Sequence, residues 1–493
     1  MTLRLIVDQP VDGVGANVVV EFSPAGAVLD ARLDLSILPR LEPLLLGRPV
    51  EQVPPLVERL CGVCPAAHHL AGVAALEALH GIGPIPAEAR RIRRLLHYGS
   101  VLTMHATSFF AAGREDGLAL RKLGKLAQAA AGSPGHFPAS AVVGGVSGAL
   151  VPDAAQACVD AAPAALTVAR DLFGWALNVG PGGGSSGEAT RGAGADHRGR
   201  GEAGAGSEPR ADRIEQGTDL GGRADGWDGA DGIGQGARSG GDTGRTGRRD
   251  GADGIGQQGF LGADVALVDA DGRLDPLGAR LRAVGPDGAV VVDGATADEW
   301  DELVAEERPG EAASRPYLLA GGPELGRYRV GPVAQLRVGE PATPVAAALR
   351  GDWLARGGGT LAARAVLAVN CVEAIAELAG GAGGRGALRA EAAEGLPPQA
   401  QGRVGVGWVD GARGLLAHRY RTDQEGAVDQ ALILTPTAQN EYWLSRLLVQ
   451  AFAAEAGELA LENAIREADP CLPCVAAPAG HMGVAVKTVV VED

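Results

Sequence analysis

The sequence predicts a mainly helical α+β protein, with a central bundle of long helices, strands near the N-terminus and peripheral β-hairpins. Long alanine- and leucine-rich stretches between residues 33 and 175 have the pattern of helices. Short β-branched runs next to turn-rich segments, near the N-terminus and again after residue 261, have the pattern of strands. The length of 493 residues leaves room for a large core.

The first elements are strands followed by helices. Residues 3–7 and 18–22 are expected to pair as strands, because both are β-branched runs around a turn-rich segment. The pattern then becomes mostly helical, and its longest helical stretches are residues 66–80 and 90–111.

The second half of the chain alternates between hairpins and helices. Residues 266–269 and 281–292 surround the turn signals DADG and GPDG, which predicts β-hairpins. Helices are expected again over residues 297–306, 360–378 and 441–467.

A low-complexity segment divides these two halves. Residues 181–261 hold 26 of the 76 glycines, are rich in Arg, Asp and Ser, and repeat the heptapeptide GADGIGQ. Such a segment buries too little apolar surface to offset the entropy of ordering, so we expect a disordered insertion. The predicted organisation is therefore an N-terminal part (1–180), the insertion (181–261) and a C-terminal part (262–493) that packs with the first as one domain.

The acidic composition narrows the classes of function. The chain carries 44 Lys and Arg against 60 Asp and Glu, a formal net charge of −16. Nucleic acids and anionic membranes attract basic surfaces, so we expect protein and small-molecule partners and no nucleic acid. The sequence begins without a signal-peptide pattern and contains no run of about 18 apolar residues, which predicts a cytoplasmic protein without a membrane span.

The cysteines indicate a metal site. Six cysteines in a chain of this length are too few for a disulfide scaffold. Cys61 and Cys64 form a CxxC pair before a helix, and Cys471 and Cys474 form a second pair near the other end. Two such pairs can supply four thiolates to one metal ion. A closed zinc site is one interpretation of this spacing, whereas a thioredoxin-like redox pair would explain only one motif.

The two cysteine segments also carry a resemblance. RLCGVCPAAH (residues 59–68) and DPCLPC (residues 469–474) resemble the two signature motifs of the large subunit of nickel-iron hydrogenases. Further blocks that resemble the family are residues 38–48, 105–116, 135–145, 328–334, 411–414 and 435–440. The doubled His68-His69 and the strand-rich region 266–317 are most similar to the soluble cytoplasmic hydrogenases that exchange electrons with nicotinamide or deazaflavin carriers.

The resemblance implies a nickel and iron centre held by the four motif cysteines. Cys61 and Cys471 would be terminal ligands of nickel, and Cys471 would accept the proton released from hydrogen. Cys64 and Cys474 would bridge nickel to an iron that carries cyanide and carbon monoxide. Soft thiolates suit a redox-active nickel, and their spare lone pairs allow bridging. Glu42 lies in the segment that supplies a magnesium ligand in the family.

Other side chains receive roles from the same resemblance. Arg413 would sit above the open coordination position, where its charge complements the anionic cyanides. Pro436 and Thr437 belong to the block over the iron, and the Thr437 hydroxyl would face a cyanide nitrogen. His68, four residues after Cys64, would donate to the bridging sulfur, although a histidine satisfied by a core carbonyl is the alternative.

Asp116 has two equally acceptable interpretations. In the first it pairs with Arg413 as part of the catalytic machinery, and in the second it caps a turn.

Two positions depart from the family pattern. Val14 stands where the family has a Glu that takes the proton from the terminal cysteine, so protons would need another exit. Ala477 stands where the family has a His or Arg at which a maturation protease cuts and which also binds magnesium. His481, in the tail that follows, is a weak substitute because a surface histidine is the simpler interpretation.

The function expected from the sequence is the catalytic large subunit of a cytoplasmic nickel-iron hydrogenase. Cys158 and Cys371 are too few for an iron-sulfur cluster, so electrons would leave through an iron-sulfur small subunit. An NAD- or deazaflavin-linked reductase module and maturation factors are further expected partners. The alternatives are a degenerate paralogue acting as scaffold or electron-transfer subunit, favoured by Val14 and Ala477, and a zinc-stapled structural protein.

Overall fold

The computed structural model describes most of the chain outside the predicted insertion, namely residues 16–35, 42–59, 61–179, 260–381, 386–393, 402–454, 457–477 and 479–491. The described residues belong to one compact unit made of residues 1–186 and 251–493. The strand expected at residues 3–7 and all but the last two residues of the expected insertion lie outside the described residues, as does Val14.

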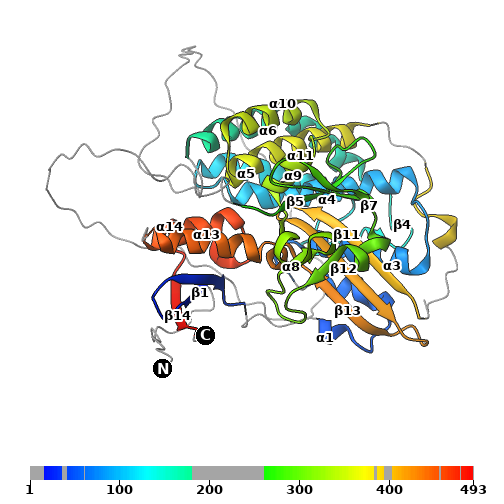
Figure 1. Cartoon of the computed structure of the whole chain (residues 1–493). Helices are drawn as coiled ribbons and strands as arrows, with labels where there is room; N and C mark the ends of the chain where they lie inside the picture. The colour runs from blue at the N-terminus through cyan, green and yellow to red at the C-terminus, as the bar shows by residue number, and fades with distance from the viewer. Residues whose placement is uncertain are drawn as a thin grey trace, which may run out of the picture. The chain divides into compact units, whose positions relative to one another are not determined.

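Four long helices pack against one another in the upper part of Figure 1: α4 (Ala87–Thr107), α5 (Arg114–Ala130), α6 (Pro152–Val179) and α11 (Thr360–Gly380). Small residues allow the helices to approach closely. A Cβ added at Gly99 of α4 would lie 2.7 Å from the carbonyl oxygen of Gly124 in α5. The expected bundle of long helices is therefore confirmed.

Helix α3 (Pro65–His80) is buried along most of its length because it lies against a sheet. The sheet is the antiparallel meander β11 (Val404–Gly411), β12 (Gly414–Thr422) and β13 (Val428–Leu434). Gly407 in β11 has no side chain to separate the two layers, and a Cβ there would lie 2.2 Å from the backbone nitrogen of Ala75. This contact fixes the position of the helix that follows the first CxxC motif.

The other strands form two further sheets and two hairpins. In the sheet of order β14-β1-β2, strand β1 (Ala16–Phe22) pairs antiparallel with β2 (Val28–Leu33) and parallel with β14 (Val484–Val490). The sheet of order β10-β5-β6-β7 contains β10 (Tyr328–Arg329), β5 (Ala263–Val268), β6 (Arg280–Val284) and β7 (Val290–Ala295). The hairpins are β3 (Ala141–Val142) with β4 (Gly145–Val146), and β8 (Val304–Glu306) with β9 (Pro316–Leu318).

Shorter helices connect these layers: α1 (Glu42–Leu45), α2 (Val53–Val57), α7 (Trp300–Leu303), α8 (Gly322–Leu325), α9 (Pro332–Val338), α10 (Pro344–Arg356), α12 (Pro436–Gln439), α13 (Glu441–Ala453) and α14 (Glu458–Ala468). Five 3-10 turns complete the described elements: η1 (Val50–Gln52), η2 (Ala297–Glu299), η3 (Leu319–Gly321), η4 (Glu391–Ala393) and η5 (Pro473–Ala476). Together the elements confirm the predicted mainly helical α+β class. None of the described helices is long and apolar enough to cross a membrane.

Two predicted helices differ from the structure. The helix expected over residues 297–306 ends at Leu303, because residues 304–306 pair with β9 as a strand. The helix expected over 441–467 is two helices, α13 and α14, and Gly457 with φ 76° is the residue before the second. Pairing partners and backbone reversals of this kind depend on tertiary structure, which a hydropathy pattern does not report.

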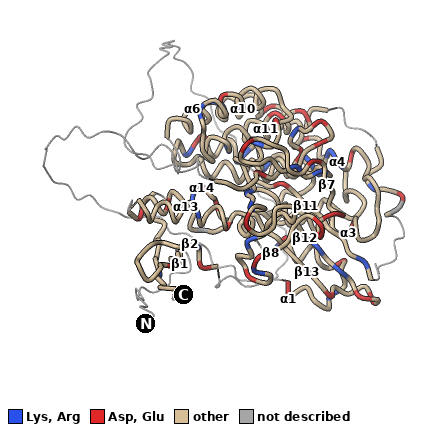
Figure 2. The backbone as a smooth tube through the Cα atoms, in the orientation of Figure 1, with Lys and Arg blue, Asp and Glu red and all other residues tan. Residues whose placement is uncertain are grey.

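Charged residues of both signs are interspersed over the described helices and strands (Figure 2). Several of the ion pairs are buried, such as Arg329 with Asp264, whose side chains are 3% and 2% exposed. The apolar residues form several clusters, of which the largest lies among α4, α5, α6 and α11.

Candidate metal centre

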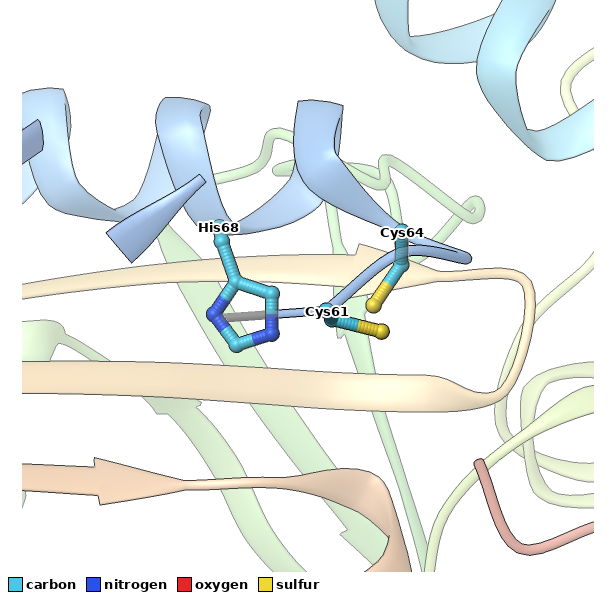
Figure 3. A group of neighbouring side chains, drawn as sticks. All are labelled: Cys61, Cys64 and His68. Atoms are coloured by element: carbon cyan, nitrogen blue, oxygen red, sulfur yellow. The ribbon is translucent and has the colours of Figure 1, made fainter. Parts of the chain in front are cut away.

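The first CxxC motif forms the N-terminus of α3. Cys64 is the residue before the helix, Pro65 is its first residue, and the backbone N–H of His68 donates to the Cys64 carbonyl at 3.3 Å. Proline suits this position because the first N–H groups of a helix have no intrahelical partner. One helical turn therefore separates Cys64 from His68. The potential ligand atoms of Cys61, Cys64 and His68 lie within 4.8 Å of one another (Figure 3).

The second motif brings a further cysteine to this group. Cys471 follows α14 in the chain, and its Sγ lies 3.4 Å from Sγ of Cys61, 410 residues away. Its backbone N–H donates to Oγ1 of Thr437 at 2.8 Å. Thr437 lies in α12, which directly follows β13, so the meander sheet positions the loop that carries Cys471.

These cysteines lie in the wall of a cavity of about 910 Å³. The predicted site residues that the structure brings to this cavity are Glu42, Cys61, Cys64, His68, Arg413, Pro436, Thr437 and Cys471. They come from α1, α3, the β11–β12 turn, α12 and the segment after α14. The fold thus collects in one place residues that the sequence distributes over both halves of the chain.

Cys474 and Asp116 lie elsewhere in the described structure. Cys474 is 3% exposed and belongs to the apolar cluster beneath the β14-β1-β2 sheet, so its side chain is not part of the described cavity wall. Asp116 lies in the first turn of α5 and is likewise absent from that wall. Their predicted roles as a bridging ligand and a catalytic carboxylate stay predictions.

Arg413 pairs with a carboxylate that the sequence analysis missed. Its Nε lies 3.2 Å from Oδ2 of Asp469, and Arg364 from α11 forms an ion pair with the same oxygen. Asp469 has a left-handed backbone with φ 47° at the end of α14, which turns the chain toward Cys471. The signal in the sequence was the acidic residue of DPCLPC, directly before the proline.

The charge of Arg413 is held firmly at this position. Burial disfavours its charged form, but Asp469 and then Cys471 oppose that effect, and the net result is a pKa above the ordinary arginine value. A permanent positive charge therefore lies over the cysteine group, where it favours thiolates and other anions.

The three thiols in the cavity are strongly coupled to one another. The pKa of Cys61 is lowered because Cys471 and Cys64 donate hydrogen bonds to its sulfur. The pKa of Cys64 is raised well above the ordinary thiol value by hydrogen bonding to Cys471 and Cys61 and by burial. Three thiols packed this closely do not readily lose their protons together. A metal cation bound among the sulfurs would favour the thiolate form of all three, because thiolates are the form that binds metals.

Two histidines beside the first motif have different surroundings. His68 Nδ1 lies 3.0 Å from Nε2 of His418 in β12, and Nδ1 of His418 lies 2.5 Å from the hydroxyl oxygen of Tyr420. The predicted alternative partner of His68, a core carbonyl, is instead seen for His69, whose Nε2 lies 2.9 Å from the carbonyl oxygen of Ala141. Neither His418 nor Tyr420 was predicted from the sequence, although their spacing of two residues places them on one face of a strand.

The tail after the second motif is folded. The carbonyl of Ala477 accepts a hydrogen bond from Arg466 at 2.8 Å. The carboxylate of Glu462 accepts the backbone N–H groups of Gly480 and Met482 at 2.7 and 2.8 Å. His481 is exposed and contacts the carbonyl of Ala479, and it is not in the described wall of the cavity.

The chain is similar to known hydrogenase subunits. Residues 40–113 match the family model described as nickel-dependent hydrogenase. The chain is 27% identical over 442 residues to a subunit of the vhu F420-non-reducing hydrogenase of Methanocaldococcus jannaschii, covering 88% of this chain and 95% of the relative. It is also 27% identical over 512 residues to the beta subunit of the NAD-reducing hydrogenase HoxS of Cupriavidus necator, covering 99% and 97%.

Solved hydrogenase structures share the fold. The crystal structure of an NAD+-reducing NiFe hydrogenase in the H2-reduced state has a TM-score of 0.69 and 26% identity, covering 93% of this chain and 95% of that chain. A NiFeSe hydrogenase from Desulfovibrio vulgaris Hildenborough shares the fold, with a TM-score of 0.58 at 16% identity and coverage of 94% and 100%. The chain is thus similar to hydrogenase subunits in sequence over most of its length and in fold, in agreement with the resemblance of its two cysteine motifs.

Proposed function

We propose that this chain is the catalytic large subunit of a nickel-iron hydrogenase, which splits hydrogen reversibly into protons and electrons. One observation carries the proposal. Thiols from motifs 410 residues apart meet with 3.4 Å between Sγ of Cys61 and Sγ of Cys471, in a cavity that Arg413 also lines. A structural zinc site would require neither a cavity nor a guanidinium beside the sulfurs.

The side chains around the cavity fit a centre of nickel and iron. Soft, closely spaced thiolates are the ligands that such metals prefer, and the adjacent positive charge suits the cyanides on iron. Cys61, Cys64 and Cys471 would hold nickel, and Cys474, three residues after Cys471, would complete the set if its side chain turned from the apolar cluster toward the cavity. Glu42 would contribute to a magnesium site. When bound, the centre supplies the heterolytic cleavage of hydrogen.

The protein side chains would orient and balance this chemistry. Arg413, held by Asp469, keeps a fixed charge toward the open side of the site. Because the Thr437 oxygen already accepts the N–H of Cys471, its hydroxyl hydrogen is available as a donor to an anionic group in the cavity. Pro436 has no N–H and forms an apolar part of the wall.

Electrons would leave through another polypeptide. The two cysteines outside the motifs, Cys158 and Cys371, are buried in α6 and α11 and cannot complete a four-thiolate cluster. Named relatives are subunits of larger hydrogenases, one of them NAD-reducing. We therefore propose an iron-sulfur small subunit, a reductase module for NAD or a deazaflavin, maturation factors and a cytoplasmic location.

Metal analysis of the chain purified with its partners tests the proposal. We expect about one nickel and one iron per chain, with infrared bands of bound cyanide and carbon monoxide. Cys471→Ser should abolish nickel binding. The control is Cys158→Ser, which replaces a buried thiol far along the chain from both motifs and should leave the metal content unchanged. Zinc as the sole metal in the native complex would refute the proposal.

A degenerate paralogue is the second candidate, and Ala477 and the burial of Cys474 outside the cavity wall favour it. Isotope exchange between deuterium gas and the protons of water distinguishes the two candidates. A metal-loaded complex that shows no exchange under reducing conditions would support the paralogue.

A further inference from the structure

A buried chain of hydrogen bonds leads from the meander sheet to the cysteines of the candidate centre. Its members are Tyr420 and His418 of β12 and His68 of α3, with the 2.5 Å and 3.0 Å contacts described above. Tyr420 and His418 are both 0% exposed, and His68 is 4% exposed. Tyr420 and His418 do not reach bulk solvent, so the direction of the two hydrogen bonds is decided by the three side chains themselves.

The tyrosine hydroxyl sets the direction. Within the described part of the chain, the Tyr420 hydroxyl has one hydrogen-bond partner, Nδ1 of His418. If Nδ1 of His418 were the donor, the buried hydroxyl hydrogen would have no acceptor, which is costly in a protein interior. If Tyr420 donates, its hydroxyl hydrogen and the ring hydrogen of His418 both find acceptors.

That direction fixes both imidazoles. A neutral His418 that accepts at Nδ1 carries its hydrogen on Nε2 and donates it to Nδ1 of His68. His68 must then carry its own hydrogen on Nε2. Figure 3 shows one ring nitrogen of His68 turned toward Cys61 and the other turned away, and Nδ1 is the one bound to His418. Burial lowers the pKa of His418 well below its ordinary value, in agreement with a neutral ring.

We propose that Tyr420 and His418 are positioning residues that hold His68 as an Nε2–H donor to the cysteine sulfurs. The assignment of hydrogens stands without any metal, whereas its catalytic meaning rests on the proposed function. A ring nitrogen that carries a hydrogen cannot bind a metal. The chain of hydrogen bonds therefore keeps His68 out of the coordination shell, although His68, Cys61 and Cys64 have the spacing of a zinc site.

Nitrogen NMR of the metal-free full chain tests the assignment. In protein labelled with 15N-histidine, long-range proton-nitrogen correlations distinguish a ring nitrogen that carries hydrogen from one that does not. The signals of His68 and His418 are identified among those of the nine histidines by comparison with His68→Gln and His418→Gln. We expect hydrogen on Nε2 and a bare Nδ1 in both His68 and His418. Hydrogen on Nδ1 of either ring in the unmodified chain would overturn the proposal.

Variants test the positioning role. Tyr420→Phe removes the hydroxyl donor that sets the direction of the hydrogen bonds. The 15N chemical shifts of His418 and His68 should then become those of a mixture of tautomers. Tyr317→Phe, at a half-buried tyrosine in β9, is the matched control and should leave both rings unchanged. His418→Gln keeps an N–H donor toward His68 and should preserve its tautomer, whereas His418→Leu should not. Unchanged His68 resonances in both Tyr420→Phe and His418→Leu would contradict the role.

X-ray absorption with zinc added to the metal-free chain provides a second readout. We expect sulfur but no imidazole nitrogen around zinc in the unmodified chain, and an imidazole ligand in His418→Leu. Imidazole coordination in the unmodified chain would contradict the proposal. If nickel and iron are missing from the native complex, the proposed function fails while the NMR result remains decisive for the hydrogen-bond chain.

Discussion

At the scale of single residues, Asp469 is the shared counter-charge of two arginines at the site. One carboxylate balances two buried guanidinium groups, those of Arg364 and Arg413. Asp469→Asn should lower the free energy of unfolding by about 3 to 5 kcal/mol, because both cations lose their buried counter-charge. Chemical denaturation monitored by circular dichroism measures the effect.

A surface carboxylate provides the control for this prediction. Asp293 pairs with Arg282 while 59% exposed. Asp293→Asn should therefore change the same free energy by less than about 1 kcal/mol. Equal effects of the two substitutions would show that burial does not determine the contribution of Asp469.

A second prediction at this scale concerns pH. Burial raises the pKa of Asp410 from 3.8 to about 7, and the hydrogen bonds from Gln335 and the Leu267 backbone only partly oppose the shift. The folded state then binds more protons than the unfolded state between about pH 4 and 7, so stability falls as pH rises through this window. The cost is absent below the unfolded pKa and fully present above about pH 7.

Asp410→Asn isolates this contribution. The variant lacks the titrating group, so its stability relative to the unmodified chain should rise by roughly 4 kcal/mol between pH 4 and pH 7.5. Urea denaturation at a series of pH values measures the difference. A difference that does not change with pH would mean that Asp410 is ionised in the folded protein throughout the range.

At the scale of elements, α3 and β11 lie in close backbone contact. Gly407→Ala would place a Cβ 2.2 Å from the Ala75 backbone, so the helix that carries Cys64 and His68 would have to move. We expect a loss of about 3 kcal/mol or more, together with weaker metal binding. Gly351→Ala in α10 is the matched control, since a Cβ there meets nothing within 4 Å and should stabilise the helix by up to about 1 kcal/mol. Thermal unfolding of both variants tests the contrast.

The C-terminal tail is another element with a testable role. Strand β14 pairs with β1 from Ala16 to Phe22, and Met482 before it is 2% exposed. Truncation after Ala477 should therefore lower the melting temperature and promote self-association, because β1 would become an exposed edge strand. Removal of residues 492–493 alone should have neither effect. Light scattering and differential scanning fluorimetry distinguish these outcomes.

The elements also show what a sequence can and cannot predict. The start of α3 follows from Cys64-Pro65 and its apolar run, because the signals are local. The pairing of β1 with β14 joins residues more than 460 positions apart, and no periodicity reports such a partner. The same limit applies at the site. The cysteine motifs and Arg413 are found from a resemblance, whereas Asp469 as the partner of Arg413 and His418 as the partner of His68 depend on packing between distant segments.

At the scale of the whole molecule, the candidate centre is built from both halves of the chain. The segment that connects the halves must therefore be long enough to join them, but it does not need a particular structure. The composition of residues 181–261 predicts that this segment adds nothing to the core, but Phe260 at its end packs against the cluster that contains Trp443. Deleting residues 187–250 leaves residues 180–186 and 251–259 as a linker that can span about 50 Å. We expect the melting temperature to change by less than about 2 °C and the metal content to stay the same.

A scrambled insertion is the control for this deletion, because it keeps length and composition while it removes the GADGIGQ repeat. If only composition matters, the scrambled chain, the shortened chain and the unmodified chain should bind equal amounts of nickel and exchange hydrogen at equal rates. A loss of partner binding in the shortened and scrambled chains alike would instead assign the repeat a sequence-specific contact. In that case the segment between the halves would take part in assembly, and the functional chain would be the full 493 residues.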